Sequence, residues 1–246
     1  MKTKLWKERW KNNRIGFHQE QVNAHLQDFW SRLNPKPKTT VFVPLCGKSN
    51  DLRWLRSQGH SVLGVEVSPI AVRDFFAENQ LQPTVSSQGS FERWEADGTA
   101  ILLGDYFSLT AEDVEQCETI FDRAALIALP LEMRVDYVEH SRRLFRGGRN
   151  TLLSTLEYDQ STADGPPFCV MESEVHRHFG NDYAISLLRT TNVLDELGGL
   201  RKRGVSTVDE KVFQLITNRD LELSISRLTS LEQLDDTWLH QIAISA

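Results

Sequence analysis

The sequence has few cysteines, no long apolar run and no excess of positive charge. Its cysteines, Cys46, Cys117 and Cys169, are odd in number and far apart, so we expect neither a disulfide framework nor a Cys-x-x-Cys metal or redox site. No segment approaches the roughly 18 apolar residues of a membrane-spanning helix, and the charged N-terminus lacks the apolar region of a signal peptide. These absences predict a cytoplasmic protein that is not embedded in a membrane.

The charge balance argues against a further class of partners. Lys and Arg number 28 against 34 Asp and Glu, which gives a net charge of -6. The chain therefore has no basic excess with which to bind nucleic acid or an anionic membrane surface. The seven histidines form no His-Glu-x-x-His pattern, so no metal site is expected. With nucleic acid and membranes disfavoured, we expect the partner to be a small molecule. The length of 246 residues suits one α/β domain.

The most informative pattern lies between residues 41 and 66. An apolar run ends in a turn at Gly47, a helical stretch follows, and a second apolar run ends at Glu66. This is the order of a nucleotide-binding βαβ unit, in which the glycine lets the backbone approach a ligand and the acid accepts hydrogen bonds from ribose hydroxyls. The G-x-G-x-x-G turn that receives a pyrophosphate is absent. The pattern therefore favours an adenosyl ligand without phosphate, and S-adenosylmethionine is the candidate.

Two other interpretations of this turn remain open. Gly47-Lys48-Ser49 matches the end of a P-loop, but that motif requires a glycine at position 42, where the chain has Phe42. A strand–turn–helix that binds no ligand is the second alternative. Within the turn, Cys46 is expected to be a small buried thiol rather than a nucleophile.

Apolar runs and helical stretches alternate along the chain, which predicts a mostly parallel sheet. Strands are expected near residues 40–45, 61–66, 91–96, 99–103, 119–123, 151–158, 184–190 and 208–217. Helices are expected near residues 4–13, 19–33, 68–79, 130–147 and 171–179, and a further helix is expected to start at Ser49. Ser49 and Ser68 are the expected N-caps of two of these helices, and Asp97-Gly98 is a strong hairpin signal.

Residues whose side chains can bind a ligand or take part in catalysis follow several of these strands. In an open α/β sheet the ligand binds outside the carboxyl ends of the strands. We therefore expect one edge of the sheet to gather Leu45–Gly47, Glu66, Asp105-Tyr106, Asp122-Arg123 and Tyr158-Asp159.

Six short motifs occur in order between Trp6 and about Thr217. They are Trp6-x-x-x-Trp10, Ile15–Gln19, Val43–Lys48, Gly59–Glu66, Phe121–Leu126 and Gly165–Phe168. On these motifs the chain resembles the thiopurine S-methyltransferase family, bacterial type. The resemblance implies a Rossmann-like class I methyltransferase fold: an α/β domain with a seven-stranded, mostly parallel sheet, helices on both faces and an antiparallel last strand.

The same resemblance implies a set of site residues. It assigns the cofactor S-adenosylmethionine, and its product S-adenosylhomocysteine, to Trp6, Trp10, Leu45, Gly47, Glu66, Asp105, Tyr106 and Arg123. Asp105 and Tyr106 would flank the adenine, and Phe17 would lie on the substrate side. Tryptophan faces suit a sulfonium cation. The fork of Arg123 would orient a carboxylate or an electron-rich substrate atom, with no general base proposed.

Structural interpretations of these residues stay open beside the functional ones. Trp6 and Trp10 are also what the buried face of a docking helix requires, and Phe17 suits a core position. A structural ion pair of Arg123 with Asp122 or Asp105 is the alternative to its functional role.

The chain departs from the family pattern near its end. It continues beyond Thr217 to Ala246, so we divide the single domain into a helical lid over residues 1–38, an α/β core over 39–217 and an extension over 218–246. The extension is too apolar for simple disorder. We expect a monomer, with a dimer through the extension as the alternative. Arg201 and Arg203 are both candidates for the substrate-contacting arginine of the relatives.

The resemblance implies an S-methyltransferase that acts on small aromatic or heterocyclic thiols, with selenium and tellurium compounds as further acceptors in metalloid detoxification. One alternative is a methyltransferase that acts on another nucleophile, such as halide, oxygen or nitrogen. A protein that binds the cofactor without catalysis is the other.

Overall fold

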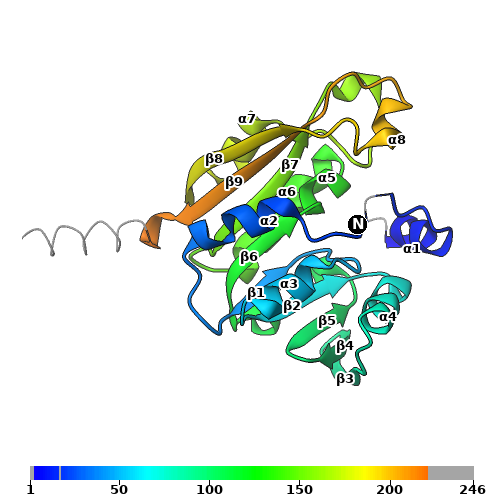
Figure 1. Cartoon of the computed structure of the whole chain (residues 1–246). Helices are drawn as coiled ribbons and strands as arrows, with labels where there is room; N and C mark the ends of the chain where they lie inside the picture. Colours follow the sequence, from blue (N-terminus) through cyan, green and yellow to red (C-terminus); the bar gives the residue numbers. More distant parts are fainter. Residues whose placement is uncertain (1–2, 17, 221–246) are drawn as a thin grey trace, which may run out of the picture.

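Within the part of the chain that the structure describes, nine strands form one mixed sheet (Figure 1). The computed structural model describes residues 3–16 and 18–220. The strands are β1 (Thr40–Val43), β2 (Ser61–Glu66), β3 (Thr84–Gln88), β4 (Phe91–Ala96), β5 (Thr99–Leu103), β6 (Cys117–Arg123), β7 (Asn150–Glu157), β8 (Tyr183–Asn192) and β9 (Asp209–Thr217). Their order across the sheet is β3-β4-β5-β2-β1-β6-β7-β9-β8. The central strands β5, β2, β1, β6 and β7 run parallel, and the outer pairings are antiparallel.

The expected count of seven strands is wrong, because β3 and β4 extend the sheet as an antiparallel hairpin beyond β5. The sequence did not indicate β3, whose side chains are almost all exposed and show no apolar alternation. The predicted turn at Asp97-Gly98 is confirmed. Both residues have positive φ angles, +47° and +69°, as a two-residue hairpin loop between twisted strands requires.

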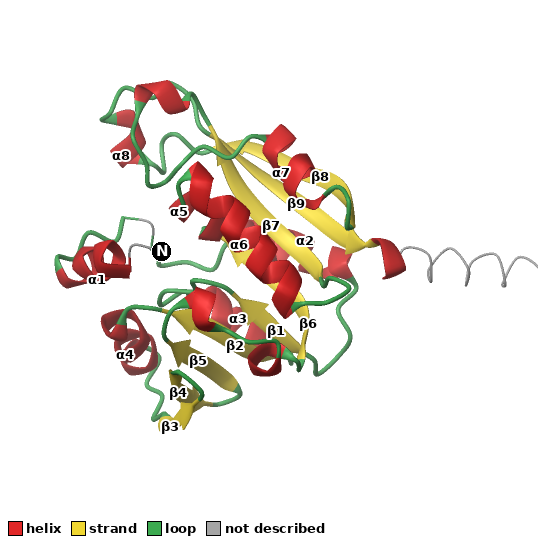
Figure 2. Cartoon of the chain, turned by 180° about the vertical axis from the view of Figure 1, so that it is seen from behind, coloured by secondary structure: helices red, strands yellow, loops and turns green. Residues whose placement is uncertain are grey.

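Helices cover both faces of the sheet (Figure 2). The helices are α1 (Thr3–Lys11), α2 (Ala24–Phe29), α3 (Asp51–Ser57), α4 (Pro69–Glu78), α5 (Ala125–Ala128), α6 (Leu131–Leu144), α7 (Glu172–Phe179) and α8 (Gly198–Arg201). Four short 3-10 helices are η1 (Trp30–Leu33), η2 (Tyr106–Ser108), η3 (Glu112–Val114) and η4 (Gln160–Thr162). The mostly parallel α/β arrangement is as predicted.

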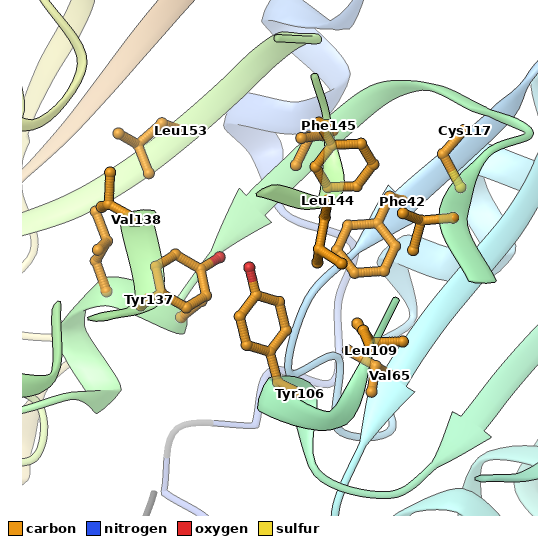
Figure 3. Close-up of a cluster of buried hydrophobic side chains, with 14 of the residues drawn as sticks. Phe42, Val65, Tyr106, Leu109, Cys117, Tyr137, Val138, Leu144, Phe145 and Leu153 are labelled. Atoms are coloured by element: carbon orange, nitrogen blue, oxygen red, sulfur yellow. The ribbon is translucent and has the colours of Figure 1, made fainter. Parts of the chain in front are cut away.

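The central strands contribute side chains to two separate cores, because successive side chains point to opposite faces of the sheet. Val41 and Val43 of β1 pack with α2, η1, α3 and α4. Phe42 lies between them and packs on the other face, in the cluster that holds α5, α6, α7 and Tyr106 (Figure 3).

Local hydrogen bonds decide where the helices begin. Ser68 caps α4 as predicted, since its hydroxyl accepts from the backbone N–H of Ala71 at 3.4 Å. The predicted helix over residues 19–33 starts later, at Ala24, because the side chain of Asn23 accepts from the N–H of Leu26 at 3.0 Å. The predicted N-cap Ser49 lies one residue before the actual N-cap position, Asn50. Its hydroxyl group accepts from the N–H of Asp51, the first residue of α3, at 3.1 Å.

The outer edge strand β8 is irregular. Its pairing with β9 shifts register between Leu187 and Arg189. The guanidinium of Arg189 lies 4.6 Å from the ring centroid of Phe29 and pairs with Asp28.

Two helices lie at the end of the sheet where the parallel strands finish. Helix α1 and the segment around α8 both stand at this carboxyl edge, on either side of the strand ends (Figure 1). Among the described helices, none has the length and apolar character needed to cross a membrane.

Candidate functional site

A cavity of about 480 Å³ opens at the carboxyl edge of the sheet. Its walls come from α1, from the turn between β1 and α3, from the ends of β2, β6, β7 and β9, and from residues 193–203. Its lining includes Trp10, Leu45, Gly47, Asp51, Glu66, Arg123, Ser154, Arg203 and Glu210.

The turn after β1 is built around two left-handed residues. Leu45 and Gly47 have φ angles of +47° and +56°. Opposite the turn, the ring of Trp10 lies so close that a Cβ added at Gly47 would be 3.3 Å from its Cζ2 atom. A residue other than glycine would therefore be strained in its backbone and would narrow the cavity between the turn and α1.

Glu66 ties the end of β2 to this turn. Its Oε2 accepts from the N–H of Gly47 at 2.9 Å, and its Oε1 accepts from the N–H of Ser68 at 2.7 Å. Burial raises the pKa of the carboxyl group above its ordinary value, although these backbone hydrogen bonds oppose the shift. Each oxygen of an ionised carboxylate has two lone pairs, so both retain capacity for a ligand's hydroxyl group.

Arg123 forms an ion pair with a residue that the sequence did not indicate. Its Nε lies 3.1 Å from Oδ2 of Asp51, whose side chain is only 2% exposed. The expected partners were Asp122 and Asp105. Asp122 precedes Arg123 on β6 and points to the opposite face, where it accepts from the hydroxyl group of Tyr137 at 2.6 Å.

A second buried polar group lies further along the same edge. Oε1 of Glu210 accepts from the hydroxyl group of Ser154 at 2.5 Å, and Oε2 lies 3.4 Å from Nε2 of His25. Burial opposes the ionisation of Glu210, but the hydrogen bonds from His25 and Ser154 outweigh it, so the pKa of Glu210 is lowered. The group is therefore held as a carboxylate.

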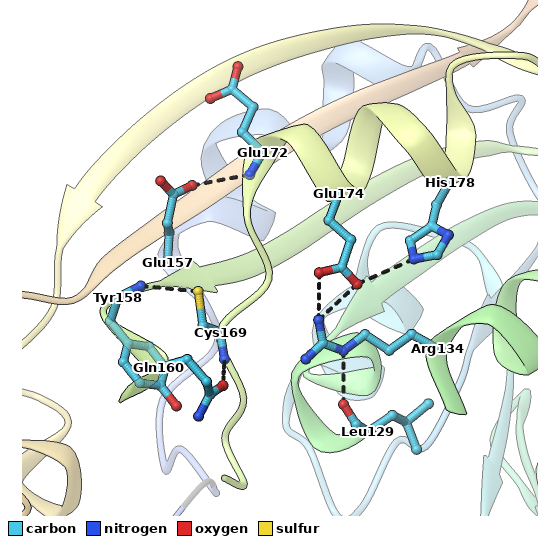
Figure 4. A network of polar contacts seen from close by, with 9 residues as sticks. All are labelled: Leu129, Arg134, Glu157, Tyr158, Gln160, Cys169, Glu172, Glu174 and His178. Carbon is cyan, nitrogen blue, oxygen red and sulfur yellow. Dashed lines mark hydrogen bonds and ion pairs between the residues drawn. The ribbon is translucent and has the colours of Figure 1, made fainter. Parts of the chain in front are cut away.

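Prolines form another part of the cavity wall. Pro166 and Pro167 line the cavity, and the N–H of Phe168 donates to the carbonyl of Ile127 at 2.7 Å. Behind this wall the buried Arg134 donates to the carbonyl of Leu129 at 2.9 Å (Figure 4).

The buried charge of Arg134 has a matching partner. Its Nη1 donates to both carboxylate oxygens of Glu174, at 2.8 and 2.7 Å (Figure 4). Nε2 of His178 lies 3.3 Å from Oε1 of the same carboxylate. The ion pair therefore joins α6 to α7, and the bond to Leu129 holds Arg134 at the junction of α5 and α6.

The structure brings most of the predicted site residues together. Those that line the cavity are Trp6, Trp10, Leu45, Gly47, Glu66 and Arg123. Phe17 lies outside the described residues. Asp105 and Tyr106 do not line the cavity: Asp105 accepts from the N–H of Phe107 at 3.1 Å, and the buried ring of Tyr106 stacks on Tyr137 at 4.8 Å between centroids. Their expected contact with adenine stays a prediction.

The structure also separates the two candidate arginines of residues 199–204. Arg203 lines the cavity. Arg201 is not among the lining residues and pairs with Asp195 at 2.7 Å. Of the two, Arg203 is therefore the one at the cavity, where its guanidinium also donates to the carbonyls of Gly199 and Asp164.

The predicted lid over residues 1–38 consists of two different parts. Side chains of Trp6, Trp10, Gln19 and their neighbours face the cavity. Leu26 and Leu33, in contrast, are buried in the core against the sheet. Only the part before α2 has the position of a cover.

Several lining residues were missed by sequence reasoning. Asp51, Ser154 and Glu210 carry no motif and belong to a helix or to strands whose patterns signal only burial. Their shared position follows from strand order, which the sequence alone did not determine. Among the described residues, no group of His, Cys, Asp and Glu is arranged to hold a metal ion.

The residues present fit an adenosyl ligand without phosphate. The bare backbone of Gly47 leaves one wall open, and the buried carboxylate of Glu66 offers acceptors beside it. The turn has no series of glycines for phosphate groups. Trp10 faces Gly47 across this end of the cavity.

Comparison with known proteins identifies relatives over most of the chain. A family model described as Thiopurine S-methyltransferase matches residues 1–219. The chain is 46% identical to a thiopurine S-methyltransferase of Pseudomonas fluorescens (strain Pf0-1), over 87% of this chain and 99% of the relative. It is 43% identical to one of Nitrosospira multiformis, over 88% of this chain and 99% of the relative.

Solved structures show the same fold. A 1,6-didemethyltoxoflavin-N1-methyltransferase of Burkholderia thailandensis with bound S-adenosylhomocysteine has a TM-score of 0.57 at 13% identity, over 88% of this chain and 87% of its own. A phosphoethanolamine N-methyltransferase 2 of Haemonchus contortus has the same TM-score at 9% identity, over 78% of this chain and 52% of its own. At these identities the likeness concerns the fold, which is that of S-adenosylmethionine-dependent methyltransferases.

Proposed function

Because the chain belongs to the thiopurine S-methyltransferase family, we propose that it transfers a methyl group from S-adenosylmethionine to the sulfur atom of small aromatic or heterocyclic thiols, thiopurines included. The observation that supports this most directly is the cavity in which the open turn at Gly47, the carboxylate of Glu66 and the guanidinium of Arg123 meet. The cofactor when bound supplies an electrophilic methyl group on a cationic sulfur.

The residues around the Gly47 turn each contact a different part of the cofactor in this proposal. Glu66 accepts hydrogen bonds from ribose hydroxyls, and Gly47 and Leu45 provide a close backbone and apolar wall. The face of Trp10 is suited to a sulfonium cation, a contact worth about 0.5–2 kcal/mol. These residues bind and orient; they move no proton.

Arg123 orients the attacking atom. Its Nε is engaged by Asp51, so the guanidinium is fixed in the cavity wall rather than mobile. A thiolate needs no base, and catalysis then comes from holding sulfur and methyl carbon in a near-attack geometry, which contributes about 7–11 kcal/mol in favourable cases. The part of the chain before α2 covers this space and excludes water.

Binding and turnover test the proposal separately. S-adenosylhomocysteine should bind the protein in calorimetry, and methyl transfer should follow with aromatic and heterocyclic thiols. A panel that adds halides, phenols, amines, selenite and tellurite distinguishes acceptor classes. Binding without transfer to any thiol would contradict the proposal, and transfer only to another nucleophile would reassign the acceptor.

The remaining expectations concern assembly and location. We propose a cytoplasmic monomer that binds neither nucleic acid nor membranes, with one methyltransferase domain. The alternative dimer would use the extension, whose residues 221–246 lie outside the described residues. Light scattering on the full chain and on a chain that ends at Asp220 would reveal a dimer of this kind.

A further inference from the structure

Glu210 is a largely buried carboxylate in the cavity wall with no role in holding the cofactor. Its side chain lines the cavity and is only 13% exposed. Burying a carboxylate is costly unless hydrogen bonds compensate. The hydroxyl group of Ser154 supplies one such bond at 2.5 Å, and His25 lies 3.4 Å away on the other side.

Strand order places this carboxylate beside Arg123. Ser154 of β7 is the register partner of Arg123 on β6. The same Ser154 donates to Glu210 of β9, the strand on the far side of β7. Arg123 and Glu210 therefore flank one strand and both line the cavity, and the positive charge of Arg123 contributes to the lowered pKa of Glu210. The cavity wall therefore presents a hydrogen-bond donor on one side of β7 and an acceptor on the other.

This donor–acceptor pair matches the reacting edge of a heterocyclic thiol in its thione form. That edge carries a sulfur atom, which accepts hydrogen bonds, next to a ring N–H, which donates one. We propose that Glu210 binds the ring N–H of such an acceptor and takes its proton as the sulfur is methylated. The inference rests on the proposed S-methyltransferase function and specifies its acceptor class.

The step balances without any additional reagent. The acceptor sulfur forms a bond to the methyl carbon and displaces the leaving sulfur, which keeps the electron pair of the broken bond. The electron pair of the ring N–H bond becomes part of a ring C=N bond. The proton passes to the carboxylate of Glu210 and reaches solvent when the product leaves.

His25 and Ser154 are positioning residues in this scheme. His25 is buried, stacks on Phe29 with centroids 6.3 Å apart, and holds Oε2 of Glu210. Ser154 holds Oε1. Because the carboxylate is already fixed, it loses little conformational entropy when it binds the ring N–H.

A pair of matched ligands tests the contact by binding alone. Pyridine-2-thione has the ring N–H, and 1-methylpyridine-2-thione lacks it. With S-adenosylhomocysteine present, calorimetry on the wild-type protein should show a preference of about tenfold for pyridine-2-thione. Glu210→Gln should abolish that preference. Asp209→Asn, on the same strand but outside the cavity lining, removes one carboxylate as a control and should preserve it.

Turnover provides the second measurement. The ratio of kcat/KM for pyridine-2-thione to that for benzenethiol, which has no N–H, should fall by about tenfold in Glu210→Gln. Ser154→Ala, which keeps the carboxylate but frees Oε1, should lower the same ratio by a smaller factor. This variant carries the test if Glu210→Gln fails to fold.

The outcomes separate the two proposals. Equal losses for both thiols, or an unaltered preference between the two thiones, would show that Glu210 is a structural acceptor only and overturn this inference. A wild-type protein that methylates neither thiol would instead overturn the proposed function.

Discussion

Arg123 and Asp51 form a buried ion pair in which Nε lies 3.1 Å from Oδ2. The other carboxylate oxygen of Asp51 accepts from the backbone N–H of Asn23 at 2.8 Å. One aspartate therefore connects the end of β6, the start of α3 and the chain just before α2. Through it, the orientation of Arg123 depends on the segment that leads to the cover of the cavity.

Arg123→Lys separates geometry from charge. Lysine keeps the positive charge but cannot engage Asp51 and a substrate atom through one planar fork. We expect turnover to fall by about tenfold or more, which corresponds to about 1.4 kcal/mol in the transition state, with a native circular dichroism spectrum. Wild-type turnover would show that Arg123 serves only to neutralise Asp51.

Glu66→Ala should weaken cofactor binding. The variant leaves ribose hydroxyls without their acceptor and also releases the N–H of Gly47, to which Glu66 is bonded at 2.9 Å. The expected loss is about 1.5–3 kcal/mol, the range for hydrogen bonds to a charged group. Calorimetric titration with S-adenosylhomocysteine measures it, and an unchanged dissociation constant would place the ribose elsewhere.

Gly47→Val should abolish cofactor binding in a protein that still folds. The added Cβ would lie 3.3 Å from Trp10, at a φ of +56° that a β-branched residue resists. Gly16 also lines the cavity but has open space around it, so Gly16→Ala is the matched control. Normal titration of the valine variant would rule out close approach of the cofactor at this turn.

Asp122 should make stability fall with rising pH. Burial raises its pKa from 3.8 to about 6. Between these values the unfolded chain has lost the proton that the folded protein retains, so the free energy of unfolding decreases as pH rises through this window and is constant above it with respect to this group. Asp122→Asn removes that contribution. Denaturant titrations at pH 3.5 to 7 should show the wild type losing stability relative to the variant, and parallel curves would contradict the assignment.

The segment before α2 should behave as a cover. Helix α1 contributes cavity-lining tryptophans, and the ring of Trp10 is close to Gly47. Because such a segment opens at low cost, we expect proteolysis of residues 3–19 to slow when S-adenosylhomocysteine binds. Deletion of residues 1–18 should leave a folded sheet with little methyl transfer. Full activity of the shortened chain would show that the tryptophans contribute packing alone.

The sequence predicted the central sheet because its strands are continuous apolar runs. Such runs identify β1, β2, β6 and β7, which are buried on both faces. The polar edge strand β3 has no such signal and was missed. For the site, Gly47 and Glu66 were found from their spacing, whereas Asp51 and Glu210 reach the cavity only through strand order and helix packing.

Tyr106 shows a different limit of prediction from sequence: a residue predicted at the site whose side chain lies in the core. Its position directly after a strand predicted a place at the ligand edge. The side chain instead turns into the core beneath η2, where it meets the rings of Tyr137 and His140. Sequence position fixes where the backbone emerges, while the direction of a side chain depends on the partners available on each face.

The register shift in β8 has a consequence for how copies of this protein meet. An edge strand offers unpaired backbone groups to any incoming strand, and natural proteins interrupt such edges with bulges and charges. The shift between Leu187 and Arg189 breaks the regular ladder that a second chain would have to match. The charged Arg189, tied to Asp28 and Phe29, adds a further obstacle. Strand β8 is therefore a poor template for pairing with a strand of a second molecule.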